Sequence, residues 1–229
     1  MIRAVCFDAG ATLLRPDPPV EEVYGRVFQA DGARFTPEQL QGALLATWKD
    51  VQAMRGDRYG GVTGEVDFWR AFLSRVRGRL DGGEVSPEAF SRLATHFRDP
   101  ASWMVYADVR PTLEALRDRG LALAVISNWD SHLPSLLDAL RLTPYFRTIS
   151  VSAIEATGKP ESAIFLRTCE RLGVSPSEAL HVGDSPTDDV EGAEGAGLSA
   201  VLLDRDDRHG HLPRRIRGLD ELANWISPP

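Results

Sequence analysis

Five short apolar runs separated by helical patterns constrain the fold of this chain more than any other feature of its sequence. The runs are AVCF at 4–7, LALAVI at 121–126, TISVS at 148–152, ALHV at 179–182 and SAVLL at 199–203. Continuous apolar runs of this length are typical of strands in a parallel sheet that is covered on both faces. Because helical patterns alternate with them, they predict an α/β fold built on a doubly wound, Rossmann-like parallel sheet.

Helical patterns lie before the second run and between the later four runs. They predict helices at 110–119, 131–140, 162–172 and 188–196. Pro111 and Gly120 bound the first of these helices. Ser131 is expected to cap the second helix, and Gly173 is expected to end the third.

The stretch between the first and second runs is far longer than an ordinary crossover, which indicates an insertion. It contains helical patterns at 20–31, 37–54, 65–80 and 87–97. Thr36-Pro37 and Ser86-Pro87 are start signals for two of them. We therefore expect residues 1–17 and 101–229 to form the core domain and residues 18–100 to form an inserted helical-bundle cap, with Phe68, Trp69 and Phe72 in the core of the cap.

Composition excludes several classes of function. The net charge of −7 and the pI near 5.3 argue against a nucleic-acid partner, whose binding site is usually basic. No stretch has the length of a membrane span and the start does not resemble a signal peptide, so we expect a cytoplasmic protein without a membrane partner. Cys6 and Cys169 lack metal-binding spacing and are expected to be buried.

Two stretches rich in arginine are expected to be solvated surface. The first includes Arg55, Arg58, Arg70, Arg75, Arg77 and Arg79, and it could alternatively steer an anionic substrate. The second runs from Arg205 to Arg217 and carries His209 and His211. These two histidines have no carboxylate partner at ligand spacing, so we expect no metal site there.

Side chains that can carry chemistry follow four of the apolar runs. Asp8 follows the first run, and Ser127 and Asn128 follow the second. Lys159 lies in the loop after the third run, and Asp184 follows the fourth. Ligands of open parallel sheets bind beyond the carboxyl ends of the strands, so we expect these residues to meet at one edge. Two carboxylates, a hydroxyl and an ammonium provide ligands for a hard cation, a nucleophile and donors to phosphate oxygens, which predicts a phosphoryl-transfer site.

Four segments together resemble the signatures of the haloacid dehalogenase-like hydrolase superfamily, in the branch whose helical cap is inserted after the first strand. The segments are FDAGATL (7–13), VISN (125–128), GKPESAIF (158–165) and HVGDSPTDDVEGAEGAGL (181–198). The resemblance covers nearly the whole chain, and the last segment is the most specific. It implies a hydrolase that acts on a small phosphorylated metabolite or similar small molecule with Mg²⁺ as cofactor.

The resemblance also implies a role for each matching residue. Asp8 would be the nucleophile that forms an aspartyl-phosphate. Mg²⁺ would be held by Asp8, the backbone carbonyl of Gly10 and Asp184. Ser127 and the backbone N–H of Asn128 would bind phosphate oxygens.

The same resemblance assigns supporting roles to three further residues. Lys159 would neutralise the charge shared by the nucleophile and the phosphate. Asp189 would orient either a metal-bound water or Lys159. Thr12 would form a hydrogen bond within the first loop.

The first signature departs from the pattern of the family's phosphatases. They have Asp-x-Asp-Gly-Thr, whereas this chain has Asp8-Ala9-Gly10-Ala11-Thr12. The missing second aspartate is a general acid and base in the phosphatases, a role worth typically 10²–10⁴-fold in rate. Glycine cannot perform that role. The chain is also similar to a less characterised branch of the superfamily that lacks the same aspartate.

Three hypotheses therefore stay open. The chain is a phosphatase with weak or atypical activity, a phosphate- or metabolite-binding protein that has lost turnover, or a dehalogenase- or phosphonatase-type hydrolase. Dehalogenases of the family need no divalent metal, so the aspartates around Asp184 argue against them. A phosphonate-cleaving enzyme would need a lysine from the cap, where Lys49 is the only one and is expected to be packed in a helix.

Overall fold

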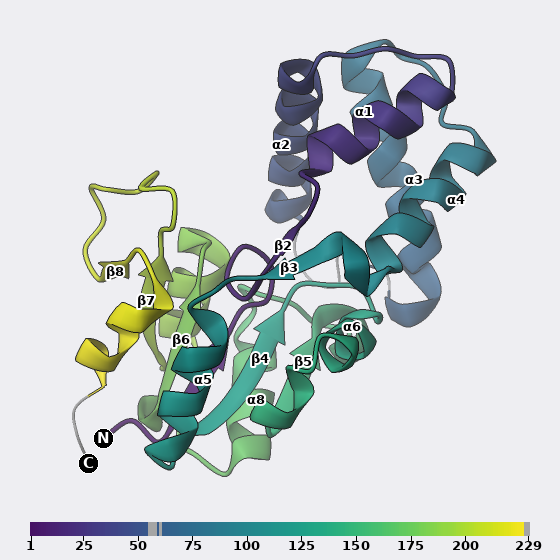
Figure 1. Cartoon of the computed structure of the whole chain (residues 1–229). Coiled ribbons are helices and arrows are strands. Elements are labelled where there is room, and N and C mark those ends of the chain that lie inside the picture. The colour runs from purple at the N-terminus through teal and green to yellow at the C-terminus, as the bar shows by residue number, and fades with distance from the viewer. Residues whose placement is uncertain (55–58, 60, 227–229) are drawn as a thin grey trace.

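The computed structural model describes residues 1–54, 59 and 61–226, and it consists of a parallel sheet with flanking helices beside a bundle of four helices (Figure 1). The sheet contains, in spatial order, β5 (Thr148–Val151), β4 (Ala122–Ser127), β1 (Ala4–Phe7), β6 (Ala179–Gly183), β7 (Ser199–Leu203) and β8 (Arg215–Ile216). All neighbouring strands are parallel. The chain winds outward from β1 in both directions, which confirms the predicted doubly wound α/β fold.

Helices cover both faces of the sheet. Large apolar side chains fill one face, whereas the other face contains many alanines. Val5 and Phe7 of β1 lie in the cluster that includes α5 (Val109–Asp118) and α6 (Leu133–Ala139), whereas Cys6 lies in the cluster that includes α8 (Ser162–Leu172) and α9 (Gly192–Gly195). Successive strand residues point to opposite faces, so both faces of β1 are buried. The 3₁₀-helix η5 (Leu219–Trp225) packs on the same face as α5.

Two predicted helices differ from the structure. The segment predicted as one helix at 188–196 is a π-helical turn, η4 (Pro186–Glu191), followed by the single turn of α9. The second helix begins at Leu133 rather than at 131, and Ser131 does not cap it: the Ser131 backbone N–H and hydroxyl donate to Glu65 instead. Short helical turns complete this half of the chain: η2 (Thr143–Tyr145), α7 (Ser152–Glu155) and η3 (Pro176–Glu178).

The bundle is inserted between β1 and β4, as the sequence predicts. Its helices are α1 (Val20–Ala30), α2 (Pro37–Ala53), α3 (Gly61–Leu80) and α4 (Pro87–Arg98). The hydroxyls of Thr36 and Ser86 accept hydrogen bonds from backbone N–H groups and cap α2 and α4. Phe72 is buried in the bundle core, while Phe68 and Trp69 are partly exposed and pack against it.

The two connections between the sheet and the bundle pair with each other. β2 (Leu14–Pro16) and β3 (Trp103–Val105) form an antiparallel ribbon, and the short 3₁₀-helix η1 (Pro100–Ser102) precedes β3. The backbone N–H of Asp17 donates to the Ser102 carbonyl at 2.9 Å and extends the ribbon by one bond. Neither segment is among the strands that the sequence predicts.

Several surface expectations can also be compared with the structure. Cys6 and Cys169 are buried, as predicted. Arg70, Arg75 and Arg79 are exposed, whereas Arg77 is buried against Phe28 and pairs with Asp81, so the first arginine-rich stretch is only partly a solvated face; Arg55 and Arg58 lie outside the described residues. None of the helices in the described part of the chain combines the length and apolar character that a membrane span requires.

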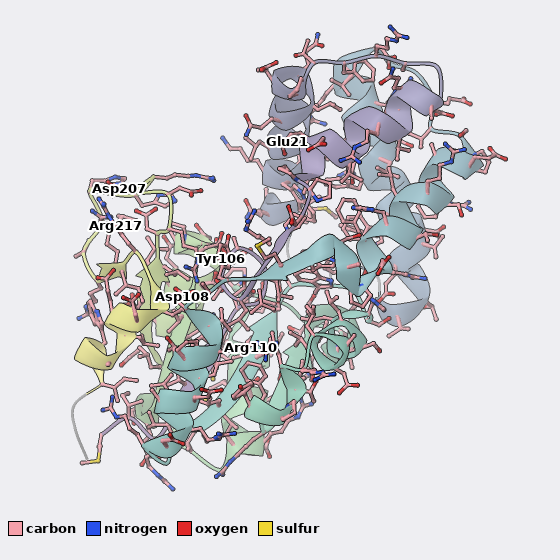
Figure 2. All side chains as sticks on the ribbon, in the orientation of Figure 1. Glu21, Tyr106, Asp108, Arg110, Asp207 and Arg217 are labelled. Atoms are coloured by element: carbon pink, nitrogen blue, oxygen red, sulfur yellow. The ribbon has the colours of Figure 1, made fainter. Side chains whose placement is uncertain are left out.

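Arg205, just after β7, joins three segments that are distant in sequence. Its guanidinium donates to both carboxylate oxygens of Asp108 at 2.9 and 3.0 Å and to the Thr12 carbonyl at 2.9 Å. It also lies 3.9 Å from the ring centroid of Tyr106. Asp108 accepts a further bond from the Leu219 backbone N–H at 2.8 Å. Figure 2 shows Asp108 at the start of α5, with Tyr106 close by. The β7–β8 connection is thereby fastened to the start of α5 and to the first loop.

We predict that Asp108→Asn lowers the free energy of unfolding by about 1–2 kcal/mol at pH 7, because the charge-assisted bonds to Arg205 weaken. Burial raises the pKa of Asp108, but the bonds from Arg205 and Leu219 outweigh burial and hold the pKa below its usual value. A depressed pKa stabilises the fold above the unfolded value of about 3.9, and this contribution is lost as the pH falls further. The difference between wild type and variant in urea unfolding should therefore be constant above about pH 5 and shrink below about pH 4.

The matched control is Asp206→Asn, which removes an exposed ion pair with Arg208. Exposed pairs of this kind contribute about 0–1 kcal/mol, so the control should unfold almost as wild type does. Equal losses in the two variants would contradict a special role for Asp108.

Candidate active site

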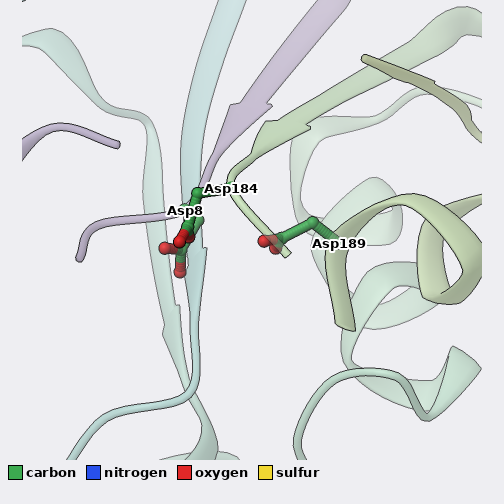
Figure 3. Close-up of side chains that lie close together, drawn as sticks. All are labelled: Asp8, Asp184 and Asp189. Atoms are coloured by element: carbon green, nitrogen blue, oxygen red, sulfur yellow. The ribbon is translucent and has the colours of Figure 1, made fainter. Parts of the chain in front are cut away.

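Three carboxylates meet at the carboxyl edge of the sheet. Asp8 follows β1, Asp184 follows β6, and Asp189 lies in η4. β1 and β6 are paired neighbours, with Phe7 opposite Val182, so the first two carboxylates leave the sheet side by side. Figure 3 shows Asp189 pointing toward the other two, and one oxygen of each carboxylate lies within 4.8 Å of the others. Within the described part of the chain this is the one group of three or more possible ligands close enough to hold a metal.

A buried ammonium lies between two of these carboxylates. Lys159 Nζ is 2.6 Å from Asp8 Oδ1 and 2.6 Å from Asp189 Oδ1, and only 3% of the lysine side chain is exposed. Burial opposes the charge on the ammonium, but the charges of Asp189 and Asp8 outweigh burial and raise the pKa of Lys159. Lys159 is therefore a permanent cation beside the candidate nucleophile.

Ser127, the last residue of β4, and Asn128, which follows it, fix Asp8 and Lys159 in place. Ser127 Oγ donates to Asp8 Oδ1 at 2.9 Å. The amide of Asn128 bonds twice to the backbone of Lys159: it accepts from the N–H at 2.8 Å and donates to the carbonyl at 2.8 Å. A Cβ on Gly158 would lie 2.6 Å from Asn128 Oδ1, so only glycine allows this close approach.

Asp189 is held by a residue that the sequence did not single out. His181 in β6 is fully buried, and its Nε2 lies 2.9 Å from Asp189 Oδ1. Since an ionised carboxylate accepts, Nε2 carries the proton. The Ser185 backbone N–H donates to Asp189 Oδ2 at 2.9 Å. Burial raises the pKa of Asp189, but Lys159 and His181 outweigh it and hold the pKa below its usual range. The sequence does contain a signal for His181, because it is the one polar residue in the apolar run ALHV at 179–182.

The balance of charge at the site is negative. Burial, followed by repulsion from Asp8 and Asp189, raises the pKa of Asp184 well above its usual value. Burial also raises the pKa of Asp8, although Lys159 and Ser127 oppose the shift. Three carboxylates face one ammonium, so a divalent cation at the oxygen cluster would relieve the repulsion. The donor set, consisting only of oxygens, suits Mg²⁺.

The first loop has an unusual backbone conformation and differs from one expectation. Ala11 has a φ of +54°, in the left-handed region where glycine is favoured. The Thr12 hydroxyl is buried without a hydrogen-bond partner among the described residues, so the expected bond within the loop is wrong; its carbonyl accepts from Arg205 instead. A Cβ on Gly10 would lie 3.3 Å from Trp129 Cζ3, which places an indole beside the position of the missing aspartate.

A cavity of about 390 Å³ extends from the carboxylates to the helical bundle. Asp8, Gly10, Ser127, Asn128, Lys159, Asp184 and Asp189 line its polar end. Aromatic side chains dominate the other end, and they include Tyr24, Trp48, Trp69, Phe90, Phe97, Trp103 and Trp129. All the residues predicted for the site except Thr12 therefore face one cavity.

The bundle is hydrogen-bonded to the loop that follows β4. Glu65 in α3 is buried and accepts from the Ser131 hydroxyl at 2.9 Å and from its backbone N–H. Trp69 Nε1 donates to Asp130 Oδ2 at 3.1 Å. The position of the bundle is thus coupled to the loop that carries Asn128.

Comparison with known proteins identifies the family. The profile of the haloacid dehalogenase-like hydrolases matches residues 2–197, and the chain belongs to this family of hydrolases. It is 30% identical to the haloacid dehalogenase-like hydrolase domain-containing protein 3 of Danio rerio, over 96% of this chain and 95% of the relative. It is also 30% identical to the glyceraldehyde 3-phosphate phosphatase of Methanopyrus kandleri, over 93% of this chain and 89% of the relative. Among solved structures, the phosphatase of this family from Thermococcus onnurineus superposes with a TM-score of 0.69 at 29% identity, covering 99% of each chain.

We predict that Gly183→Ala disrupts the site and lowers the free energy of unfolding by about 1–3 kcal/mol, the usual cost of overpacking. A Cβ at this position would lie 2.2 Å from the carboxyl carbon of Asp189, so the carboxylate would have to leave Lys159. Urea unfolding measures the loss.

Gly195→Ala is the matched control, because a Cβ there meets nothing within 4 Å. Its stability should equal or slightly exceed that of wild type. A Gly183→Ala variant as stable as this control would show that Asp189 does not pack against residue 183.

Proposed function

We propose that this hydrolase is a Mg²⁺-dependent phosphatase that acts through an aspartyl-phosphate on Asp8, with weak or atypical turnover because Gly10 replaces the acid and base. The proposal rests on the hydrogen bonds of the Asp8 carboxylate. Lys159 and Ser127 both donate to Oδ1, and Oδ2 has no hydrogen-bond partner among the described residues. One oxygen is thus held in place while the other is available for attack at the cavity.

The resident cation would be held by Asp8, Asp184 and the backbone carbonyl of Gly10. When bound, Mg²⁺ would offset the negative charge that gathers on the phosphoryl oxygens. The repulsion that raises the pKa of Asp184 supports a cation at this position. Asp189, already engaged by Lys159 and His181, would act as a positioning residue.

The protein's own groups would then carry the two steps. Asp8 Oδ2 attacks phosphorus, and the bond from phosphorus to the leaving oxygen breaks with its electron pair on that oxygen. Lys159 stays on Asp8 Oδ1 and balances the charge on Asp8 and the phosphoryl group. The Ser127 hydroxyl would turn from Asp8 Oδ1 to the substrate, so that it and the Asn128 N–H bind phosphoryl oxygens. Water then hydrolyses the acyl phosphate and regenerates Asp8. Without a general acid, leaving groups that depart readily as anions, such as aryl and acyl groups, should react best.

The helical bundle would serve as a cap over this site. We assign residues 1–17 and 101–229 to the catalytic core and residues 18–100 to the cap, with the β2–β3 ribbon as the hinge. The cap supplies most of the aromatic end of the cavity. The named phosphatase among the relatives supports a small phosphorylated metabolite as the substrate.

The alternatives find less support. A dehalogenase that attacks carbon has no use for the acidic cluster around Asp184. A phosphonatase would need a lysine from the cap at the site, but Lys49 is exposed and does not line the cavity. The expectation that Lys49 is packed within its helix is wrong. A binding protein that has lost turnover is separated from the phosphatase by the first experiment below.

We predict that Mg²⁺ raises the melting temperature of wild type, since a ligand that binds the folded state stabilises it. Asp184→Asn should lose most of that rise. Without Mg²⁺ the variant should melt no lower than wild type, because the repulsion among the carboxylates is reduced. In parallel, hydrolysis of acetyl phosphate and para-nitrophenyl phosphate should require Mg²⁺ and disappear in Asp8→Asn.

Each result separates the hypotheses. Stabilisation by Mg²⁺ and inorganic phosphate without turnover of any ester would favour the binding protein. Turnover that survives both chelation and Asp8→Asn would exclude the proposed nucleophile.

We also predict that Gly10→Asp raises turnover of alkyl phosphates such as glycerol phosphate by about 10- to 100-fold, near or below the lower end of the range for acid–base catalysis. The gain is limited because the new side chain displaces Trp129. Gly10→Asp/Ala11→Gly should exceed the single variant, because glycine relieves the φ of +54° at residue 11. Matched assays at saturating Mg²⁺, with Ala11→Gly alone as control, decide the point. Folded variants that bind Mg²⁺ but gain nothing would contradict an otherwise intact site.

A further inference from the structure

An aromatic ring lies beside the position of the missing aspartate. Trp129 follows Asn128 directly, and its six-membered ring lies 3.3 Å from where a Cβ of residue 10 would stand. The backbone of Trp129 is fixed to Ser152 by two hydrogen bonds, at 3.1 and 3.2 Å. The indole is partly exposed and lines the cavity together with Asp8. A leaving group bonded to phosphorus therefore meets a ring where a phosphatase of this family would present a carboxylic acid.

The aromatic surface continues away from Trp129. Trp103 lies 5.0 Å from Trp129 between ring centroids, and Phe97 lies 6.2 Å from Trp103. Spacings of 4.5–7 Å are those of favourable aromatic pairs. The three rings come from the loop after β4, from β3 and from α4, so core and bundle both contribute to this wall.

Two carboxylates along the same wall, those of Glu65 and Asp130, are already engaged within the protein. Glu65 accepts two hydrogen bonds from Ser131. Asp130 accepts from Trp69 through one oxygen and from the His132 backbone N–H through the other. A leaving group rich in hydroxyls would give up hydrogen bonds to water without gaining these carboxylates as partners. A flat apolar ring has no such hydrogen bonds to lose when it packs against the wall.

We propose, on the basis of the phosphatase function proposed above, that the substrates are aryl phosphates whose aromatic leaving group packs against Trp129. Asp8 attacks phosphorus, the bond from phosphorus to the phenolic oxygen breaks, and the aryl oxide leaves with the electron pair and takes its proton from water. A phenol ionises near pH 10, far more readily than an alkyl alcohol, so this departure needs no acid from the enzyme. The missing aspartate and the aromatic wall thus select the same class of compound.

The first test is binding without chemistry. Phenylphosphonate and cyclohexylphosphonate, titrated calorimetrically into the full chain with Mg²⁺, compare a flat ring with an aliphatic ring of similar size. We expect phenylphosphonate to bind about 3- to 10-fold more tightly, the range of one favourable aromatic pair. Trp129→Leu should bring the ratio to within about twofold of one, and Trp129→Phe should restore it. Trp225→Leu, which removes an exposed tryptophan outside the cavity lining, should keep the wild-type ratio. Equal affinities in wild type, or a ratio unchanged in folded Trp129→Leu, overturn the proposal.

The second test separates this inference from the function on which it rests. Acetyl phosphate has a good leaving group but no ring, and therefore reports on the phosphatase chemistry alone. The ratio of kcat/KM for phenyl phosphate to that for acetyl phosphate should fall about 3- to 10-fold in Trp129→Leu and recover in Trp129→Phe. If acetyl phosphate is hydrolysed but the ratio does not change, the aryl assignment is wrong and the phosphatase stands. If neither ester is hydrolysed by wild type with Mg²⁺, the phosphatase proposal fails and the aryl assignment fails with it.

Discussion

The buried ammonium of Lys159 is the interaction on which the rest of the site depends. A charge in the interior is tolerated only when its partners are fixed, and here Asp8 and Asp189 are both held at 2.6 Å. That requirement extends outward, because the Asn128 amide fixes the lysine backbone. His181 bonds the same oxygen of Asp189 as the lysine does, and the Ser185 backbone N–H holds the other. The proposed nucleophile, Asp8, therefore has a cationic neighbour, and the sheet rather than a flexible side chain sets its position.

The parts that the sequence predicts well are those with a local cause. Apolar runs mark the strands because both faces of the sheet are covered, and the carboxyl ends of parallel strands share one edge. Asp8 and Asp184 could therefore be expected together before any coordinates. Thr36 and Ser86 predict the starts of α2 and α4 because capping acts through the next three residues.

The parts that it misses depend on contacts across space. Ser131 has the chemistry of a helix cap, but Glu65, 66 residues away in sequence, competes for the same groups. The role of His181 follows only from the approach of Asp189. Strand β8 is two residues long in an arginine-rich stretch and has no apolar run to mark it. Trp129 looks like an ordinary loop aromatic until the fold places it against Gly10. Local patterns carry no information about such neighbours.

The bonds from Glu65 and Trp69 to residues 130 and 131 make the bundle and the loop after β4 a single thermodynamic unit. Any displacement of the bundle has to release the loop, and any ligand held by the loop adds its binding free energy to the cost of that displacement. The coupling acts in both directions. When the bundle is held in place the loop is already ordered, so the loop loses less conformational entropy when it binds a ligand. Residues in α3 that never touch a ligand of the loop can therefore set how long that ligand stays bound.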